Sequence, residues 1–541
     1  MLNRTNYRHF GVMLDCSRNA VMKVEQIKKI IDILSLMGYN CLELYTEDTY
    51  EIKGEPYFGY MRGRYTSAEI KEIDAYAKEK GLELIPCIQT LAHLEGMFRH
   101  KEYAAINDTA NILMVDEERT YQLIDKMFAT LAENFTSRLV NIGMDEAHMV
   151  GLGKFLDKYG YQNRFELLSR HLKKVLDIAT KYGFKAHMWS DMYFRLANHD
   201  RYYVNEDFVM PAKVIEQIPE GVALVYWDYY HKLKKDFDDN MLAHKALGKP
   251  FWFAGGAWTW NGFAPLNEFS LITMKGAIES VRSTGVQDVL ITMWRDNGSE
   301  CSFYAVLPAL YAIRQYAEGN FDEEKIAQGF EKLFGIRYDD FLALDLPNGD
   351  GEMFKECGFP IQQNPCKILL YSDPFMGIKD DQYAKRPAWD FADYAKRIAS
   401  AGAKAGEYGY IFDVLSKLCE TLAYKARLGV NTRAAYEAKD KKALQALLSD
   451  YEEAYKKLLV FHEAFYELWK KENKPYGWEI QDARLGGVAM RLKTCRKRLE
   501  EYLNGEVDKI DELEEKLLPT EENLYMLKNN YSQLISWNHL G

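Results

Sequence analysis

Two adjacent carboxylates, Asp145 and Glu146, are the side chains of this sequence best placed for acid–base chemistry. They follow an apolar run that begins at Leu139 and is typical of a buried strand. Gly143 lets the backbone bend, so the two carboxylates need not point to opposite faces. Crowded carboxylates push their pKa values apart, which makes one of them a proton donor near neutral pH. The alternative at this point is an aspartate that caps the next helix beside a solvated glutamate.

The elements that must position this pair alternate regularly along the first 320 residues. Strands are predicted at 10–15, 40–45, 82–89, 139–142, 184–189, 221–228, 250–256 and 286–294. Helices are predicted at 24–37, 67–80, 117–134, 164–181, 236–247, 268–283 and 303–316. Eight strands alternating with helices predict a (β/α)8 TIM barrel, whose chemistry lies at the carboxyl ends of its strands.

Four later strand ends carry aromatic and acidic residues in a repeated pattern. The pattern comprises Trp189 with Asp191, Tyr226 with Asp228, Trp258 with Trp260, and Trp294 with Asp296. Indole rings pack against the C–H faces of a sugar while carboxylates accept hydrogen bonds from its hydroxyls. One tryptophan of this kind would be structural, but the repetition indicates a sugar site.

The second half of the chain has a different pattern. Residues 331–345 look helical, 347–387 are loop-rich, and helical periodicity dominates at 391–430, 438–471, 481–503 and 508–534. We therefore predict a catalytic barrel over residues 1–345 and a mostly α-helical C-terminal domain over residues 346–541. An apolar face of the helical domain would make the protein a homodimer.

Composition excludes several classes of partner. The 541 residues are 48% hydrophobic and 28% charged, with a net charge of −11 and no basic block. Nucleic acid and membrane are therefore not expected as partners. The eight cysteines form no CxxC pair and fit buried thiols. With no apolar signal segment at the N-terminus and no run of 18 apolar residues, we expect a cytoplasmic protein.

The motifs together resemble glycoside hydrolase family 20, the β-N-acetylhexosaminidases. The resemblance rests on the run from Asn141 to Glu146, the aromatic and acidic strand ends in the family's order, and Gly11-x-x-x-Asp15-x-Ser17-Arg18. It is nearest to the GcnA-like bacterial subgroup, whose barrel precedes a helical domain. Phe10 replaces an arginine that grips the sugar hydroxyls in many members, so the loop of Glu47 and Asp48, or Asp228, would take over that contact. Asp296 stands where glutamate is usual.

The resemblance implies an exo-acting enzyme that removes terminal β-linked GlcNAc, or β-linked GalNAc, from an oligosaccharide or glycoconjugate. It implies a retaining, substrate-assisted mechanism without a cofactor, in which the 2-acetamido oxygen attacks the anomeric carbon. Glu146 would be the acid and base, Asp145 would hold the acetamido N–H and stabilise the oxazolinium intermediate, and Tyr226 would aim the acetamido oxygen. The predicted substrate-binding residues are Trp189, Asp191, Asp228, Trp258, Trp260, Trp294, Asp296, His93, His148 and Glu47.

Two other functions remain open on the sequence. A metal-dependent barrel hydrolase could use His93, His148 and His187 near strand ends, although no H-x-H pair occurs and no metal ligands are assigned. His148, two residues after the acid, fits better as a residue that orients Glu146. A non-catalytic sugar-binding barrel is the third possibility, and the intact carboxylate pair argues against it.

Overall fold

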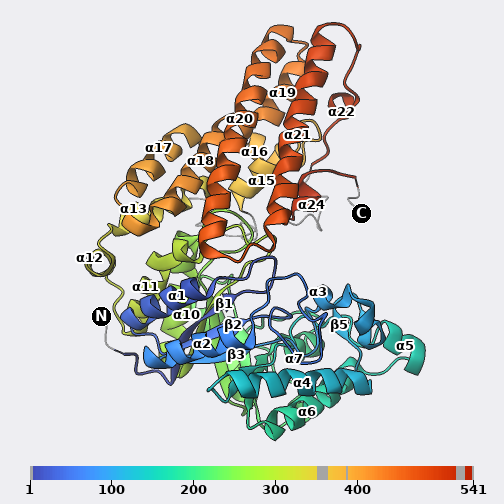
Figure 1. The fold of residues 1–541 in the computed structure, drawn as a ribbon, viewed down its shortest axis with the longest axis vertical. Helices are drawn as coiled ribbons and strands as arrows, with labels where there is room; N and C mark the ends of the chain where they lie inside the picture. Colours follow the sequence, from blue (N-terminus) through green and yellow to red (C-terminus); the bar gives the residue numbers. More distant parts are fainter. Residues whose placement is uncertain (1–3, 350–363, 386–387, 520–529, 539–541) are drawn as a thin grey trace. The chain divides into compact units, whose positions relative to one another are not determined.

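The computed structural model describes residues 4–349, 364–385, 388–519 and 530–538 (Figure 1). Its internal contacts divide the chain into two units. The barrel unit comprises Met1–Ala257, Ser270–Trp294 and Ala309–Asp322. The helical unit comprises Trp258–Phe269, Arg295–Pro308 and Glu323–Gly541. The segments that follow the last two barrel strands thus group with the helices, and so do residues 323–345, which lie before the predicted boundary at 345.

Eight strands form a closed barrel in the order β1-β10-β9-β8-β7-β6-β3-β2. They are β1 (His9–Asp15), β2 (Cys41–Tyr45), β3 (Glu83–Cys87), β6 (Leu139–Asn141), β7 (Lys185–Trp189), β8 (Val222–Trp227), β9 (Phe251–Gly256) and β10 (Asp288–Met293). All neighbouring strands are parallel, so their carboxyl ends meet at one rim. The predicted barrel and its eight strands are confirmed. A small antiparallel pair, β4 (Asn107–Thr109) and β5 (Ile112–Leu113), lies in the segment between β3 and β6.

Amphipathic helices surround the strands (Figure 1). The main ones are α1 (Val24–Leu36), α2 (Ser67–Glu79), α4 (Glu118–Asn134), α6 (Arg164–Lys181), α9 (Lys234–Ala246), α10 (Asn267–Thr284) and α11 (Leu307–Ala317). Shorter ones are α3 (Glu95–Phe98), η1 (Lys101–Ile106), α5 (Lys154–Tyr159), α7 (Asp191–Ala197) and α8 (Ala212–Gln217). In α2, a capping box between Thr66 and Glu69 begins the helix, and Ile70, Ile73 and Ala77 form its buried face.

A polar layer lies inside the barrel. The Trp252 ring stacks between two histidines, with centroid distances of 4.7 Å to His9 and 4.6 Å to His187. His187 Nε2 lies 2.6 Å from the Glu43 carboxylate, which is fully buried. Asn141 donates to the other oxygen of Glu43 at 3.3 Å. These partners satisfy the buried groups and connect β2 to β6 and β7.

The helical unit is built around long helices. Its elements are η2 (Phe303–Val306), α12 (Glu323–Phe334), α13 (Tyr338–Leu342), η3 (Ala343–Asn348), α15 (Pro365–Tyr371), α16 (Asp380–Ala384), α17 (Phe391–Gly402), η4 (Gly406–Tyr408), α18 (Gly409–Lys425), α19 (Leu428–Glu437), α20 (Lys441–Glu472), α21 (Trp478–Leu503), α22 (Asp511–Glu514) and α24 (Tyr531–Leu534). In α20, Leu458, Phe461 and Phe465 recur every three or four residues on the buried face. The α-helical nature of this half of the chain is confirmed.

Two predicted helical segments differ in the structure. Segment 391–430 is interrupted after Gly402, where a Cβ would lie 2.6 Å from Phe412 Cβ, so the close approach of α17 and α18 fixes the break. In segment 508–534, residues 520–529 lie outside the described part, and the rest contains only the short helices α22 and α24. Within the described residues, no helix is long and apolar enough to cross a membrane.

Candidate active site

The turn after β6 carries the carboxylate pair on a strained backbone. Gly143, Met144 and Glu146 have φ values of 71°, 70° and 51°, in the left-handed region. A Cβ on Gly143 would lie 2.2 Å from Gln89 Oε1, so only glycine fits there. The Asp145 side chain is 13% exposed and that of Glu146 is 46% exposed. The turn therefore separates the two carboxylates, with Asp145 inside and Glu146 open to a ligand.

Asp145 is held as an anion. Its Oδ1 accepts a hydrogen bond of 2.7 Å from Gln89 Nε2, and its Oδ2 lies 3.2 Å from His93 Nε2. Burial raises the pKa of Asp145, but the positive charge of His93 and these contacts outweigh it and lower the pKa overall. Burial alone would lower the pKa of His93, yet Asp145 raises it to about 10. His93 is thus a cation at neutral pH, and its Nε2 lies 3.7 Å from Glu146 Oε2.

A third carboxyl group, Asp191, contacts the turn that carries the pair. It is fully buried, and its Oδ2 accepts from the Glu146 backbone N–H at 3.1 Å and from Arg195 Nε at 3.3 Å. Burial and the negative charges of Asp145 and Glu146 raise the pKa of Asp191 to about 7. Asp191 Oδ1 has no hydrogen-bond partner among the described residues. Through its other oxygen, Oδ2, Asp191 holds the backbone of Glu146.

Aromatic rings form a wall around this cluster. Trp189 and Trp294 lie with their ring centroids 5.9 Å apart, and the Tyr45 ring meets Trp294 edge-on at 4.9 Å. The Arg18 guanidinium lies 5.8 Å from the Trp294 ring centroid. The buried indole nitrogen of Trp189 lacks a hydrogen-bond partner within the part of the chain described, so a ligand atom could accept from it.

A hydrogen-bonded chain connects Asp145 to the predicted residue Glu47. Gln89 Nε2 also donates to the Tyr45 hydroxyl at 3.0 Å, and this hydroxyl donates to Glu47 Oε1 at 3.0 Å. Arg18 Nη1 lies 3.5 Å from the same oxygen. Burial raises the pKa of Glu47 to about 7, although the charges of Arg18 and His93 oppose the shift.

Two of the predicted residues, Tyr226 and Asp228, have partners of their own away from Asp145. The Tyr226 hydroxyl donates to Asp228 Oδ2 at 2.6 Å, and its ring packs against His244 and Phe253. The same Asp228 oxygen lies 2.6 Å from His231 Nδ1. Asp228 Oδ1 accepts the backbone N–H groups of residues 230 and 231 at 3.1 and 3.2 Å. Asp228 thus orders the turn after β8, and its oxygens are already occupied.

Tyr229 lies in this turn, directly after Asp228, and its side chain is buried. Burial raises the pKa of its hydroxyl well above the usual range, side-chain hydrogen bonds from Thr292 and Trp294 oppose this, and the charge of Asp145 adds to it. Tyr229 is therefore a second candidate, beside the predicted Tyr226, for the tyrosine of the site. The choice between Tyr226 and Tyr229 depends on the direction in which each side chain leaves the backbone. A Tyr-x-Asp pattern at a strand end does not show that direction.

The other predicted residues are distributed as follows. The His148 side chain is exposed, and its backbone N–H donates to the Glu146 carbonyl at 2.7 Å. Trp258 and Trp260 are buried in the helical unit, stacked with centroids 3.9 Å apart. Asp296 is half-buried and belongs to the same unit, where its carbonyl accepts from the Asn261 N–H at 3.3 Å.

Gln89, Tyr45 and Tyr229 are site residues that the sequence did not predict. Gln89 ends the predicted third strand and Tyr45 ends the second, so their place at the rim was a usable signal. Arg18 was noticed only as part of the motif with Asp15, whose Oδ2 accepts from Arg18 Nε at 3.1 Å. Their roles depend on side-chain partners from other strands.

Two family models match the chain. The catalytic domain of glycosyl hydrolase family 20 matches residues 7–235, and the C-terminal domain of glycoside hydrolase 20C matches residues 339–531. The chain belongs to glycoside hydrolase family 20. Assignment to the GcnA-like subgroup stays a prediction.

Relatives of this family 20 chain include hexosaminidase D from Bos taurus, 25% identical over 252 residues, which are 45% of this chain and 68% of that protein. The human hexosaminidase D is 23% identical over 348 residues, 59% of this chain and 68% of that protein. A solved family 20 exo-β-N-acetylglucosaminidase from Vibrio harveyi, in complex with N-acetylglucosamine, has 17% identity and a TM-score of 0.47. That match covers 61% of this chain and 58% of the Vibrio chain, less than two thirds of its length.

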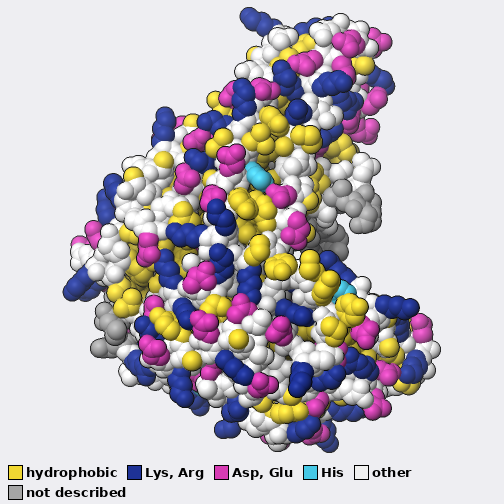
Figure 2. All heavy atoms as spheres, in the orientation of Figure 1, with side chains coloured by type: hydrophobic (Ala, Val, Ile, Leu, Met, Phe, Trp, Pro, Cys, Tyr) yellow, Lys and Arg dark blue, Asp and Glu magenta, His cyan; other side chains and the backbone are white. Residues whose placement is uncertain are grey.

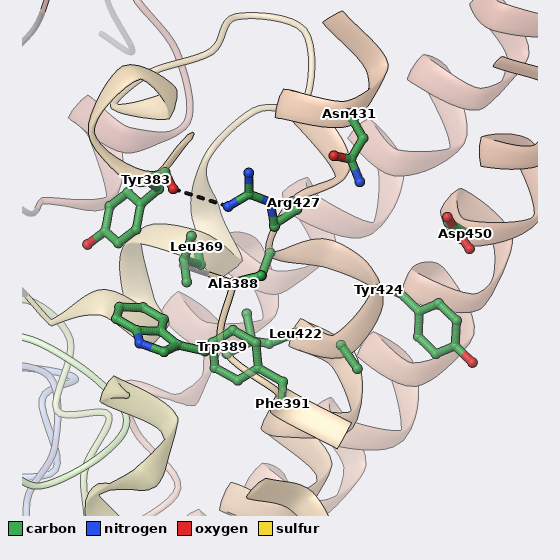
Figure 3. A pocket seen from close by; sticks show the side chains of 12 residues that line it. Leu369, Tyr383, Ala388, Trp389, Phe391, Leu422, Tyr424, Arg427, Asn431 and Asp450 are labelled. Carbon is green, nitrogen blue, oxygen red and sulfur yellow. Dashed lines mark hydrogen bonds between the residues drawn. The ribbon is translucent and has the colours of Figure 1, made fainter. Parts of the chain in front are cut away.

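A cavity of about 340 Å³ lies within the helical unit (Figure 3). Trp389 and Phe391 line one side, and Arg427 donates to the Tyr383 carbonyl at 3.2 Å. Asp450 is the only acidic residue among those that line it. The cavity therefore lacks the paired carboxyl groups of family 20 chemistry. Among the described residues, no group of three or more His, Cys, Asp or Glu side chains could hold a metal ion.

The raised pKa of Asp191 predicts how stability depends on pH. Between its ordinary value near 3.8 and the folded value of about 7, Asp191 keeps a proton that the unfolded chain releases. Stability therefore falls as pH rises through this window, by up to about 4 kcal/mol. Asp191→Asn should remove this part of the decline, measured as the free energy of unfolding in urea at pH 4.5 and 7.5. Exposed Asp207→Asn is the control, and an unchanged pH dependence in Asp191→Asn would contradict the assignment.

Proposed function

We propose that this chain is an exo-acting β-N-acetylhexosaminidase that removes terminal β-linked GlcNAc or GalNAc by the substrate-assisted retaining mechanism. The observation that carries the proposal is the fixed anion of Asp145, paired with the His93 cation, beside the more open Glu146. The names of the relatives, hexosaminidase D among them, support the same substrate class. A metal-dependent hydrolase has no comparable arrangement in its favour.

Glu146 is the proton donor and acceptor in this proposal. It protonates the departing glycosidic oxygen and then, as a carboxylate, removes a proton from the attacking water. Its backbone N–H is fixed by Asp191, and the His93 cation lies 3.7 Å from its carboxyl oxygen.

Asp145 supplies the charge that the intermediate needs. Attack of the 2-acetamido oxygen on the anomeric carbon forms an oxazolinium ring, whose positive charge spreads onto the acetamido nitrogen. A carboxylate held by Gln89 and His93 accepts the acetamido N–H without moving, so it costs little reorganisation at the moment of reaction. Tyr229 takes the role of donor to the acetamido oxygen, because its hydroxyl lies in the field of Asp145 and beside Trp294.

A pocket for a single terminal sugar is supported by the long loop after β2. Arg62 of this loop pairs with Asp48 at 3.0 Å and donates to the carbonyls of Ser17 and Arg18 after β1. The contacts fasten one loop to the other at the barrel rim, beside Arg18 and Glu47. Arg18 and Glu47 therefore replace Asp228 as candidates for the sugar hydroxyls in the absence of an arginine at position 10.

The charged intermediate gives a direct test. A thiazoline mimic of the bicyclic intermediate should bind at least about 100-fold more tightly than N-acetylglucosamine, because it gains interactions that the product lacks. Asp145→Asn should weaken the thiazoline far more than the product sugar, measured by calorimetric titration. A substrate with a 2-hydroxyl in place of the acetamido group should not be hydrolysed. Turnover of that substrate with a glycosyl adduct on Asp145 or Glu146, seen by mass spectrometry, would contradict the mechanism.

The two tyrosines give the second prediction. Tyr229→Phe should lower kcat/KM for an aryl N-acetyl-β-glucosaminide about 10- to 100-fold, because a donor to the reacting oxygen is lost. Tyr226→Phe is the matched control, and we expect a much smaller loss because Asp228 keeps His231 and two backbone donors. The reverse order of losses in steady-state kinetics would return the role to Tyr226.

The helical domain is also proposed to form a homodimer. Figure 2 shows hydrophobic side chains gathered over α20 and α21, where Tyr466, Ile480 and Met490 are 43%, 38% and 54% exposed. Exposed apolar patches of this kind often mark an interface. Light scattering should give twice the chain mass, and Tyr466→Arg with Ile480→Arg should halve it. Tyr424→Arg on α18 is the control, and a monomeric parent protein would refute the proposal.

A further inference from the structure

The loop that follows β10 is held in an unusual conformation. It runs from Arg295 to Ser302, lies within the segment Arg295–Pro308 of the helical unit, and begins directly after Trp294 of the aromatic wall. Asn297, Gly298 and Ser299 have φ values of 61°, 133° and 55° in succession. Each left-handed residue other than glycine costs about 1 kcal/mol or more, so such a run persists only where its surroundings hold it.

Cationic side chains of two helices bind the carbonyl groups of this strained turn. Lys367 of α15 donates from Nζ to the Asn297 carbonyl at 2.6 Å, and Arg484 of α21 donates to the same carbonyl at 2.7 Å. The Gln481 amide of α21 donates to the Gly298 carbonyl. A Cβ on Gly298 would lie 2.2 Å from Arg484 Nη1, so the arginine packs directly against the backbone.

Glu300 balances the charge of these cations inside the unit. Its carboxylate is fully buried, with Oε2 2.8 Å from Lys367 Nζ and Oε1 3.2 Å from Arg484 Nη1. The Tyr371 hydroxyl donates to Oε1 at 3.1 Å. The Lys367 side chain is fully buried too, so removal of one partner leaves a buried charge poorly compensated. Glu300, Lys367 and Arg484 therefore depend on one another, because each compensates the charge or satisfies the hydrogen bonds of its neighbours.

The two ends of the same loop are fixed at the end of α20. Buried Arg295 donates to the Asn473 side chain at 2.8 Å. The Ser302 hydroxyl donates to Glu472 at 2.6 Å, and Glu472 also accepts from Tyr410 at 2.8 Å. Glu300, Lys367 and Arg484 thus act between these two ends of the loop, at Asn297, the residue after Asp296.

We propose that Glu300, Lys367 and Arg484 are positioning residues that hold the loop after β10 in one conformation and thereby present Asp296 to the substrate. Asp296 immediately precedes the residue whose carbonyl binds both cations, so rotation at residue 297 would move it. The hydrogen bonds and ion pairs of the cluster are enough to support its role in holding the loop. The identity of the hydroxyls that Asp296 binds, at O4 or O6 of the terminal sugar, rests on the proposed function.

The first experiment measures the loop without using activity. Hydrogen exchange with mass spectrometry compares the full-length protein with Lys367→Met and with the milder Arg484→Lys. Amides of residues 295–303 should exchange about tenfold faster or more in Lys367→Met, because the turn loses a charged donor. Lys456→Met is the matched control, since it removes an exposed ion pair with Glu453 on α20. Unchanged protection in folded Lys367→Met overturns the proposal.

The second experiment measures substrate positioning. An aryl N-acetyl-β-glucosaminide is compared with its 4-deoxy and 6-deoxy analogues. Lys367→Met should raise KM for the parent by about tenfold, with a much smaller change in kcat, and should affect one deoxy analogue little because its contact is already absent. Asp296→Asn should show the same selectivity, and the double variant should be no worse than Asp296→Asn alone.

Three outcomes separate the explanations. Equal losses on the parent and both analogues, or losses that multiply in the double variant, mean that the cluster acts only on stability and overturn the positioning role. Arg484→Lys, which keeps the charge, should retain more of the hydroxyl selectivity than Arg484→Met. A parent enzyme inactive on every N-acetylhexosaminide would refute the proposed function, whereas the exchange experiment would still decide whether the cluster holds the loop.

Discussion

The ion pair between Asp145 and His93 is the interaction on which the rest of the site depends. It lies where water is largely excluded, so the attraction is strong and neither group keeps its ordinary pKa. Gln89 completes it by binding both the Asp145 carboxylate and the backbone N–H of Met144. The left-handed turn from Gly143 to Glu146 is then held from two directions, which offsets the cost of its strained dihedral angles.

The crowding of acids explains where the protons lie. Asp145 and Glu146 occupy one turn. Asp191 binds the Glu146 backbone N–H, and Glu47 is linked to Asp145 through Tyr45 and Gln89. Asp145 has the charge of His93 and becomes the anion, whereas Asp191 and Glu47 have weaker compensation and titrate near pH 7. A site that develops positive charge on its substrate needs one permanent anion, and Asp145 is the acid of this group that stays ionised at neutral pH.

The sequence allowed the barrel, its eight strands and the carboxylate turn to be predicted, because each depends on local patterns of apolar residues and glycine. The choice between two candidate tyrosines could not be made in the same way. Tyr226 and Tyr229 both lie at the end of β8, and the choice depends on a turn that Asp228 orders through His231 and backbone N–H groups. His93 was predicted as a site residue, but its pairing with Asp145, and that of Gln89, was not, because these residues come from another strand end and only the closed barrel brings them together.

The loop after β10 takes its conformation from helices that come later in the sequence. A loop with three left-handed residues in succession has little intrinsic stability, and hydrogen bonds to water would let it sample other conformations. Here the Asn297 carbonyl binds Lys367 and Arg484, and Glu300 makes it possible to bury the Lys367 cation. Burial matters because a solvent-exposed ion pair contributes little, whereas a buried cation bound by a carbonyl and a carboxylate strongly favours one geometry. Helices that follow the barrel in sequence can therefore fix a loop that precedes them, and the rigidity of that loop does not have to come from its own residues.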